Sequence, residues 1–240
     1  MIKIETHCHS QGFSNCGDGN SELTIKKYLE NGYKGIIITN HYSKFCYDEF
    51  YQGQTDKEKI DYFFKTNDKF SALCKERGLK TFLGVEVRCL PTMTEYMLLG
   101  FNRAFLYDNP RLYELSQQEL FALADKNGIF MYQTHPFRAG VKAGDPKYIH
   151  GAECFNGHYH HPNNNILAEK FCKENNLIGL SGTDYHHDDQ PITAGIFIPN
   201  EINDEHALVE YIFKNHFTNI KDEDLYLKSF KEHLEKKNAN

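Results

Sequence analysis

Two histidines close to the N-terminus are the strongest chemical signal in the sequence. His7 and His9 close the apolar run that begins at Ile2. Alternate side chains of a strand lie on the same face, so we expect both imidazoles to point the same way from the end of a first strand. A pair of imidazoles held side by side favours a transition-metal site.

The same pattern recurs where four later strand-like runs end. Each of these apolar runs is followed by side chains that can bind a metal ion, namely His41, Glu86, His135, and Asp184 with His186. Imidazole and carboxylate are the ligands that zinc and similar divalent ions take. Asp18, in a Gly-Asp-Gly turn, is a further candidate carboxylate. Two metals held close together can bind a phosphate and stabilise a departing oxygen, so the pattern favours hydrolysis at a multinuclear centre.

Strand-like and amphipathic helical runs alternate from start to finish. We expect strands near residues 2–6, 35–39, 80–87, 96–101, 129–134, 150–155, 177–182 and 193–198. We expect helices near residues 22–32, 57–78, 111–127, 163–176, 204–216 and 223–236. This alternation predicts an α/β fold with a mostly parallel sheet, whose functional residues gather at the carboxyl ends of the strands. Ligands from five strands must meet at one centre, which favours a closed or nearly closed barrel.

Bulk composition excludes several classes of protein. The net charge of −6 argues against nucleic-acid binding, because phosphate contacts need clustered Lys and Arg. The seven cysteines form no Cys-x-x-Cys pair, which favours reduced thiols and a cytoplasmic location. No run approaches the length of a membrane span, and no apolar signal segment opens the chain. We expect one domain over residues 1–240, with the last few residues frayed.

The order of these motifs resembles the PHP (polymerase and histidinol phosphatase) family. The motifs are His-x-His, Asp-Gly, Thr-x-His, Gly-x-Glu, His-Pro and Gly-Thr-Asp-x-His, and they run from about residue 2 to residue 216. The resemblance implies a distorted (β/α)7 barrel with a two- or three-metal site on its C-terminal face. Stand-alone members of the family are typically phosphoesterases.

The resemblance also implies a ligand set for zinc, manganese or iron ions. The first metal would have four ligands, which are His7, His9, Glu86 and Asp184. Glu86 would bridge to a second metal that also takes His135. The third metal would be held by Asp18, His41 and His186. A metal-bridging hydroxide would attack phosphorus. We expect Asp184, His186 and Arg138 to be the catalytic residues.

The chain departs from the family pattern in three places. Glu5 and Asn40 stand where aspartates are common, and Asn102 follows the fourth strand where many members place a histidine ligand. Either Asn102 coordinates a metal, or that site is looser and takes a harder ion such as Mn²⁺.

Two further side chains lie just beyond strand ends. Arg138 follows the His-Pro motif and is suited to gripping a phosphate with two parallel hydrogen bonds. Asn156 is a candidate for supporting a metal or substrate. A histidine-rich loop follows, for which a solvated loop is the favoured interpretation and substrate contact the alternative; it contains His158, His160 and His161.

Three functions remain open from the sequence. The first is a metal-dependent phosphoesterase for a small phosphorylated metabolite, such as a histidinol-phosphate-like compound or a nucleotide monoester. The second is an amidohydrolase-like hydrolase of C–N or C–O bonds, although such barrels usually carry a bridging lysine where this chain has Asn102-Arg103. The third is a non-catalytic metal-binding domain. The sequence leaves the oligomeric state open.

Overall fold

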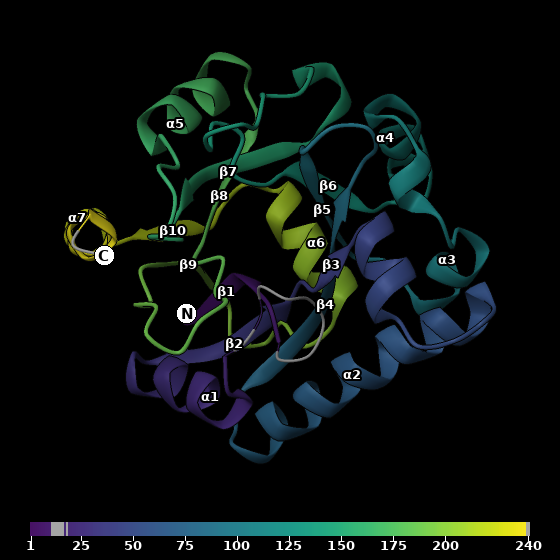
Figure 1. Cartoon of the computed structure of the whole chain (residues 1–240), viewed down its shortest axis with the longest axis horizontal. Helices are drawn as coiled ribbons and strands as arrows, with labels where there is room; N and C mark the ends of the chain where they lie inside the picture. Colours follow the sequence, from purple (N-terminus) through teal and green to yellow (C-terminus); the bar gives the residue numbers. More distant parts are fainter. Residues whose placement is uncertain (11–16, 18, 239–240) are drawn as a thin grey trace.

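The computed structural model describes residues 1–10, 17 and 19–238, and within them one continuous sheet curls into a barrel (Figure 1). Its strands are β1 (Ile2–Cys8), β2 (Tyr33–Ile38), β3 (His41–Tyr42), β4 (Lys80–Arg88), β5 (Glu95–Leu99), β6 (Phe130–Gln133), β7 (Gly151–Asn156), β8 (Ile178–Gly182), β9 (Ala194–Ile198) and β10 (Thr218–Lys221). They lie in the order β10-β9-β1-β2-β4-β5-β6-β7-β8, and β3 pairs with β4.

The barrel closes almost completely through the segment that follows β8. Tyr185 forms a parallel bridge with Cys8 at the end of β1. The backbone N–H of His9 donates to the carbonyl of Tyr185 at 3.0 Å, and the N–H of Tyr185 donates to the carbonyl of His7 at 3.2 Å. The two motifs that contribute most ligands are therefore joined by backbone hydrogen bonds.

Helices surround the strands on the outside. They are α1 (Ser21–Glu30), α2 (Asp56–Glu76), α3 (Arg103–Asp108), α4 (Gln117–Lys126), α5 (Asn165–Glu174), α6 (Glu205–Phe213) and α7 (Glu223–Asn238), with short helical turns at Cys46–Phe50, Leu112–Glu114 and Pro146–Tyr148. Capping boxes start α2 at Thr55 with Glu58 and α4 at Ser116 with Glu119, which satisfies backbone donors that a helix start leaves open.

Helix α6 is the exception, because it lies within the ring of strands in Figure 1. Its Leu208, Val209 and Ile212 pack against apolar side chains from the inner face of the barrel. These partners include Ile4, Ile37, Phe82, Met97, Leu99, Phe130, Tyr132, Leu180, Ile196 and Ile198. The end of the barrel interior next to α6 is thus filled by a packed apolar core.

The nearly closed, mixed α/β barrel confirms the fold that the sequence predicts. The sheet is not parallel throughout, since β5 runs antiparallel to β4 and β6, and β9 runs antiparallel to β1 and β10. The helix expected over 111–127 is split into the turn Leu112–Glu114 and α4, and the edge strand β10 was not expected.

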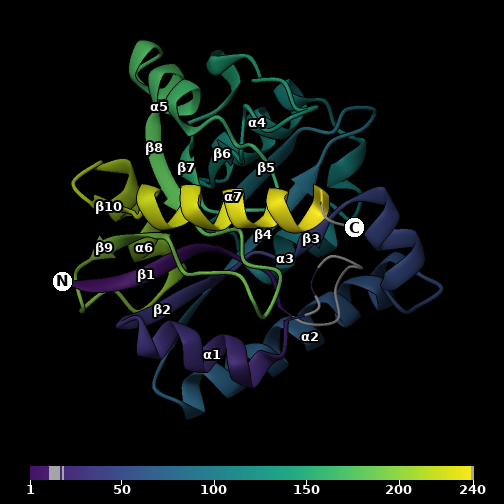
Figure 2. The same ribbon diagram turned by 60° about the vertical axis from the view of Figure 1, so that its left-hand side comes forward.

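At the C-terminal end, α7 runs across the outside of the barrel (Figure 2). It reaches Asn238, so it extends through most of the stretch expected to fray, while residues 239–240 lie outside the described part. None of the helices in the described ranges is long and apolar enough to span a membrane. The six cysteines within those ranges are free and buried.

Candidate metal centre

The end of β1 places two imidazoles against each other, as the alternation of the strand predicts. Nε2 of His7 lies 3.0 Å from Nε2 of His9. Nδ1 of His7 lies 2.7 Å from Oε1 of buried Glu153. A carboxylate accepts, so Nδ1 of His7 carries the proton and Nε2 presents a lone pair to the centre. His7 is thereby held in the tautomer that binds metals.

Two buried carboxylates face this histidine pair. Nε2 of His7 lies 3.3 Å from Oε1 of Glu86 and 3.2 Å from Oδ1 of Asp184. Nε2 of His9 lies 3.3 Å from the same Asp184 oxygen. Burial alone would raise the pKa of both carboxyl groups, but the positive charge of His7 with both ring nitrogens protonated holds each pKa well below its usual range. A metal ion that takes the place of the Nε2 proton supplies a positive charge at the same position. Both therefore stay ionised and suited to a cation.

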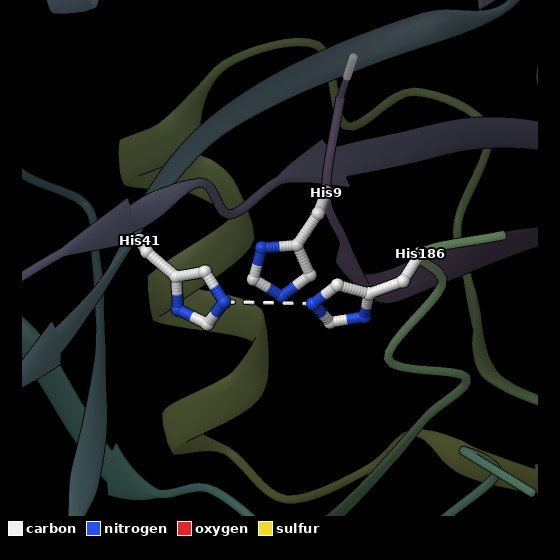
Figure 3. A group of neighbouring side chains, drawn as sticks. All are labelled: His9, His41 and His186. Atoms are coloured by element: carbon white, nitrogen blue, oxygen red, sulfur yellow. Dashed lines mark hydrogen bonds between the residues drawn. The ribbon is translucent and has the colours of Figure 1, made fainter. Parts of the chain in front are cut away.

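A second group of imidazoles meets on the other side of His9. The rings of His9 and His41 have centroids 4.3 Å apart, and those of His9 and His186 have centroids 4.1 Å apart. Figure 3 shows the three rings converging from separate segments of the chain. Nε2 of His41 lies 3.4 Å from Nε2 of His186. Since Nδ1 of His186 lies 2.9 Å from the carbonyl oxygen of Asp184, its Nε2 is the free ligand atom.

His135 completes the set from the end of β6. Its Nε2 lies 3.4 Å from Oε1 of Glu86, which therefore sits between His7 and His135. The backbone of His135 has φ of 32°, and that of Asp184 has φ of 53°. Such left-handed conformations are uncommon outside glycine and concentrate at functional sites. Both residues come two positions after a strand ends, His135 after β6 and Asp184 after β8, where the chain turns beside the other ligands.

Glu95 is a carboxylate of this centre that the sequence reasoning missed. Its Oε1 lies 3.5 Å from Nδ1 of His41, and its Oε2 lies 3.4 Å from Nε2 of His135. It opens β5, and because β5 is antiparallel, its first residue lies beside the last residues of β4 and β6. The sequence feature that could have indicated Glu95 as a ligand is a single acidic residue at the start of an otherwise apolar strand.

Asn102 lies elsewhere. Its Oδ1 accepts from the N–H of Phe105 at 3.1 Å and caps the start of α3. It follows Leu99, which pairs with Gly84 near the middle of β4, so it is directed toward the opposite end of the barrel from Glu86. The structure therefore does not bring Asn102 to the metal centre.

The remaining candidates flank the centre. Nη2 of Arg138 donates to Oδ2 of Asp184 and to Oδ1 of Asn156, at 2.5 and 3.0 Å. Nε of Arg138 donates to Oδ1 of Asn163 at 2.9 Å. Asn156 thus orients the arginine. Asp18 lies outside the described residues.

Glu5 and Asn40, which stand where aspartates are common, have structural partners. Glu5 accepts from the N–H groups of Thr6, His7 and Thr183. Asn40 accepts from the N–H of Ser10. These contacts fix the backbone around the ligands.

The residues present fit a divalent metal centre. Glu86 is buried and imidazoles surround both of its oxygens: Nε2 of His7 and Nε2 of His135 lie 3.3 and 3.4 Å from Oε1, and Nδ1 of His41 lies 2.8 Å from Oε2. A buried carboxylate is costly without a compensating charge, and a cation held between it and these imidazoles supplies that charge. Four groups of side chains here each bring their ligand atoms within 4.8 Å of one another: His7, His9 and Asp184; His9, His41 and His186; His41, Glu86 and Glu95; and His158, Asp184 and His186.

The family model for the PHP domain matches residues 5–228. The chain belongs to the PHP family. That match covers the barrel from the middle of β1 onward and all the ligands described above. It confirms the resemblance seen in the order of the motifs and makes the chain a member of a family of metal-dependent hydrolases. No curated protein matches the chain.

Several solved structures share the fold. A two-domain protein from Bacteroides vulgatus that contains a predicted PHP-like metal-dependent phosphoesterase is 18% identical, with a TM-score of 0.60 over 97% of this chain and 69% of that one. An amidohydrolase from Chromobacterium violaceum is 13% identical, with a TM-score of 0.55 over 92% of this chain and 99% of that one. A lesion-specific endonuclease from Pyrococcus furiosus is 10% identical, with a TM-score of 0.59 over 91% of this chain and 57% of that one. At these identities the likeness establishes the fold.

Proposed function

We propose that this chain hydrolyses a phosphate monoester of a small metabolite, such as a histidinol-phosphate-like compound or a nucleotide monoester, with two or three zinc, manganese or iron ions. The observation that carries this proposal is the position of Arg138, whose guanidinium is bonded to Asp184 while the other oxygen of Asp184 faces His7 and His9. A fixed cation at the edge of a metal centre is suited to an oxyanion such as phosphate.

The ligands divide into three neighbouring groups. We assign one metal to His7, His9, Glu86 and Asp184, and a second to Glu86, Glu95 and His135. The third would take His41 and His186, together with the predicted ligand Asp18. When bound, these ions activate water and neutralise the charge that develops on the phosphate oxygens.

The protein's own groups orient this chemistry. Glu153 fixes the tautomer of His7 through Nδ1 and also accepts from the backbone N–H of His135 at 2.8 Å, so one buried side chain sets two ligands. Asn156 and Asn163 hold the guanidinium of Arg138 from two sides. Arg138 would lose one contact to Asp184 and gain contacts to the substrate's phosphate.

The deciding experiment measures metal content by elemental analysis together with turnover of p-nitrophenyl phosphate, with and without added Mn²⁺ or Zn²⁺. Two or three metals per chain, with metal-dependent turnover that is lost in His9→Ala and Asp184→Ala, supports the proposal. The matched control is His206→Ala, because His206 is exposed on α6. One metal or none, without turnover, contradicts it.

A substrate panel separates the alternatives. It should include a phosphodiester, a p-nitroanilide amide and a duplex with an abasic lesion, because solved neighbours are named as an amidohydrolase and as a lesion-specific endonuclease. We propose that the monoester is preferred and that the duplex is not bound, in keeping with the net charge of −6. We further propose one catalytic domain over residues 1–240 and a cytoplasmic location, which the pattern of seven cysteines favours.

A further inference from the structure

A second cluster of histidines lies beside the centre described above. His158 and His160 are in the loop between β7 and α5, and His187 follows β8. The sequence favours a solvated loop for the first two, yet the His158 side chain is buried. We propose that His158, His160 and His187 form a separate site for one divalent transition metal of the zinc class, with three imidazole ligands and an open fourth position.

The geometry of the three rings suits a single ion. One ring nitrogen from each residue lies within 4.8 Å of the others. The centroids of His158 and His160 are 5.2 Å apart, and those of His160 and His187 are 4.9 Å apart. Three imidazoles with water in the fourth position is an established arrangement for zinc. Because the donors are all nitrogen, the site would discriminate against Mg²⁺ and Ca²⁺, which take oxygen ligands.

His158 is held in the tautomer that such a site needs. Its Nδ1 lies 2.9 Å from the backbone carbonyl oxygen of Asp184. A carbonyl only accepts, so Nδ1 donates and Nε2 keeps its lone pair. The backbone N–H of His158 donates to Oδ1 of Asn156 at 3.0 Å, and Nδ2 of Asn163 donates to its carbonyl at 2.9 Å. Metal-binding histidines characteristically donate their other ring N–H to such a partner.

Packing against two neighbouring rings positions the ring of His160. Its ring stacks on His233 of α7, with centroids 4.3 Å apart, and meets the ring of Tyr159 edge-on at 4.3 Å. His160 and His187 are both partly exposed, so an ion can enter from solvent and retain a water molecule. His158 is the buried anchor, and the other two close the site from the surface.

The new site is a neighbour of the main centre but has its own ligands. The centroids of His158 and His186 are 5.1 Å apart. His158 also lies within reach of Asp184 and His186, so the competing arrangement has His158 joining the main centre. The two arrangements differ in the role of His160 and His187, which belong only to the new site. The proposal does not depend on which reaction the main centre catalyses.

The test is the zinc stoichiometry of the full chain after equilibrium dialysis, measured by elemental analysis. We expect the double variant H160A/H187A to bind one zinc ion fewer than the wild type and than His161→Ala, whose exposed ring lies in the same loop. The same difference should persist when each variant also carries His41→Ala, which weakens the main centre. Circular dichroism of the metal-free proteins checks that all of them fold.

Two results would overturn the proposal. One is an unchanged zinc stoichiometry in H160A/H187A. The other is a loss of one ion in His158→Ala but not in H160A/H187A, which would assign His158 to the main centre. If the double variant does not fold, the single variants His160→Gln and His187→Gln replace it, each expected to weaken zinc binding by at least about tenfold through loss of one ligand.

Discussion

Oε2 of Glu95 lies 3.4 Å from Nε2 of His135, although the two residues stand at opposite ends of their own strands. Glu95 is the first residue of β5, and His135 follows the end of β6. The antiparallel pairing of these strands brings them together. We therefore treat Glu95 as a metal ligand of this chain.

Replacement of Glu95 by glutamine should weaken metal binding. The amide keeps the shape of the side chain but removes the charge that faces His41 and His135. Changes to groups that only orient ligands cost about 10–100-fold, so we expect Glu95→Gln to lower metal affinity at least about tenfold. Equilibrium dialysis with elemental analysis measures this. Glu76→Gln, at the exposed end of α2, is the control, and equal affinities for the two variants would remove Glu95 from the ligand set.

Replacement of Asn102 should lower the stability of the fold and leave metal binding unchanged. Asn102→Ala removes the cap of α3 and should lower the free energy of unfolding by about 1 kcal/mol, the usual effect of losing such a cap. Urea unfolding measures the stability, and elemental analysis should find the metal content of the wild type. A metal content reduced by one ion would instead support coordination by Asn102.

Replacement of Glu153 should weaken metal binding although Glu153 contacts the proposed ligands rather than the metal position. In Glu153→Gln, one oxygen can still accept from His7, but the new NH₂ group cannot accept from the backbone N–H of His135. We expect metal affinity or turnover to fall by about 10–100-fold. Glu174→Gln, at the exposed end of α5, is the matched change. Wild-type values in Glu153→Gln would show that the orientation of His7 does not depend on this carboxylate.

Arg138 should act on substrate binding. Arg138→Lys keeps a positive charge but cannot contact Asp184, Asn156 and Asn163 together, because an ammonium lacks the planar fork of guanidinium. We expect KM for p-nitrophenyl phosphate to rise at least about tenfold, roughly the loss of one charge-assisted hydrogen bond. Arg111→Lys, more than half exposed, is the control. A change confined to kcat would argue against a phosphate-gripping role.

His150 gives a stability effect that depends on pH. Burial lowers the pKa of His150 below its usual value and outweighs the attraction of Asp125. As the pH falls through about 6.5, His150 is protonated in the unfolded chain but stays neutral in the folded chain. The free energy of unfolding should therefore decrease as the pH drops below about 6.5. Urea unfolding between pH 7.5 and pH 5 should show a smaller loss in His150→Gln than in the wild type. Exposed His206→Gln should follow the wild type, and parallel curves for all three would contradict the assignment.

The sequence predicted most of the centre because parallel strands impose a simple rule. His7, His9, Glu86, His135 and Asp184 all follow apolar runs, and the carboxyl ends of parallel strands meet at one edge. The barrel follows from the alternation of strands and helices. These signals are local in the sequence and can be recognised without knowing how the strands pair.

The signals that failed depend on non-local geometry. The run at 96–101 does not show the direction of its strand, so Asn102 was considered as a possible ligand and Glu95 was not. His158 was assigned to a solvated loop because its burial comes from Asn156, Asn163 and the carbonyl of Asp184, which only the folded chain brings together. Tertiary contacts of this kind leave no periodic pattern.

The packing of α6 within the barrel determines the route by which substrate enters and products leave. Apolar side chains of α6 and the strands pack together at the end of the barrel opposite the histidines and block a route along the barrel axis through the described residues. Substrate must arrive, and both products must depart, through the same mouth. For the proposed hydrolysis, inorganic phosphate binds in the position that the phosphate of the next substrate takes, so we expect phosphate to be a competitive inhibitor.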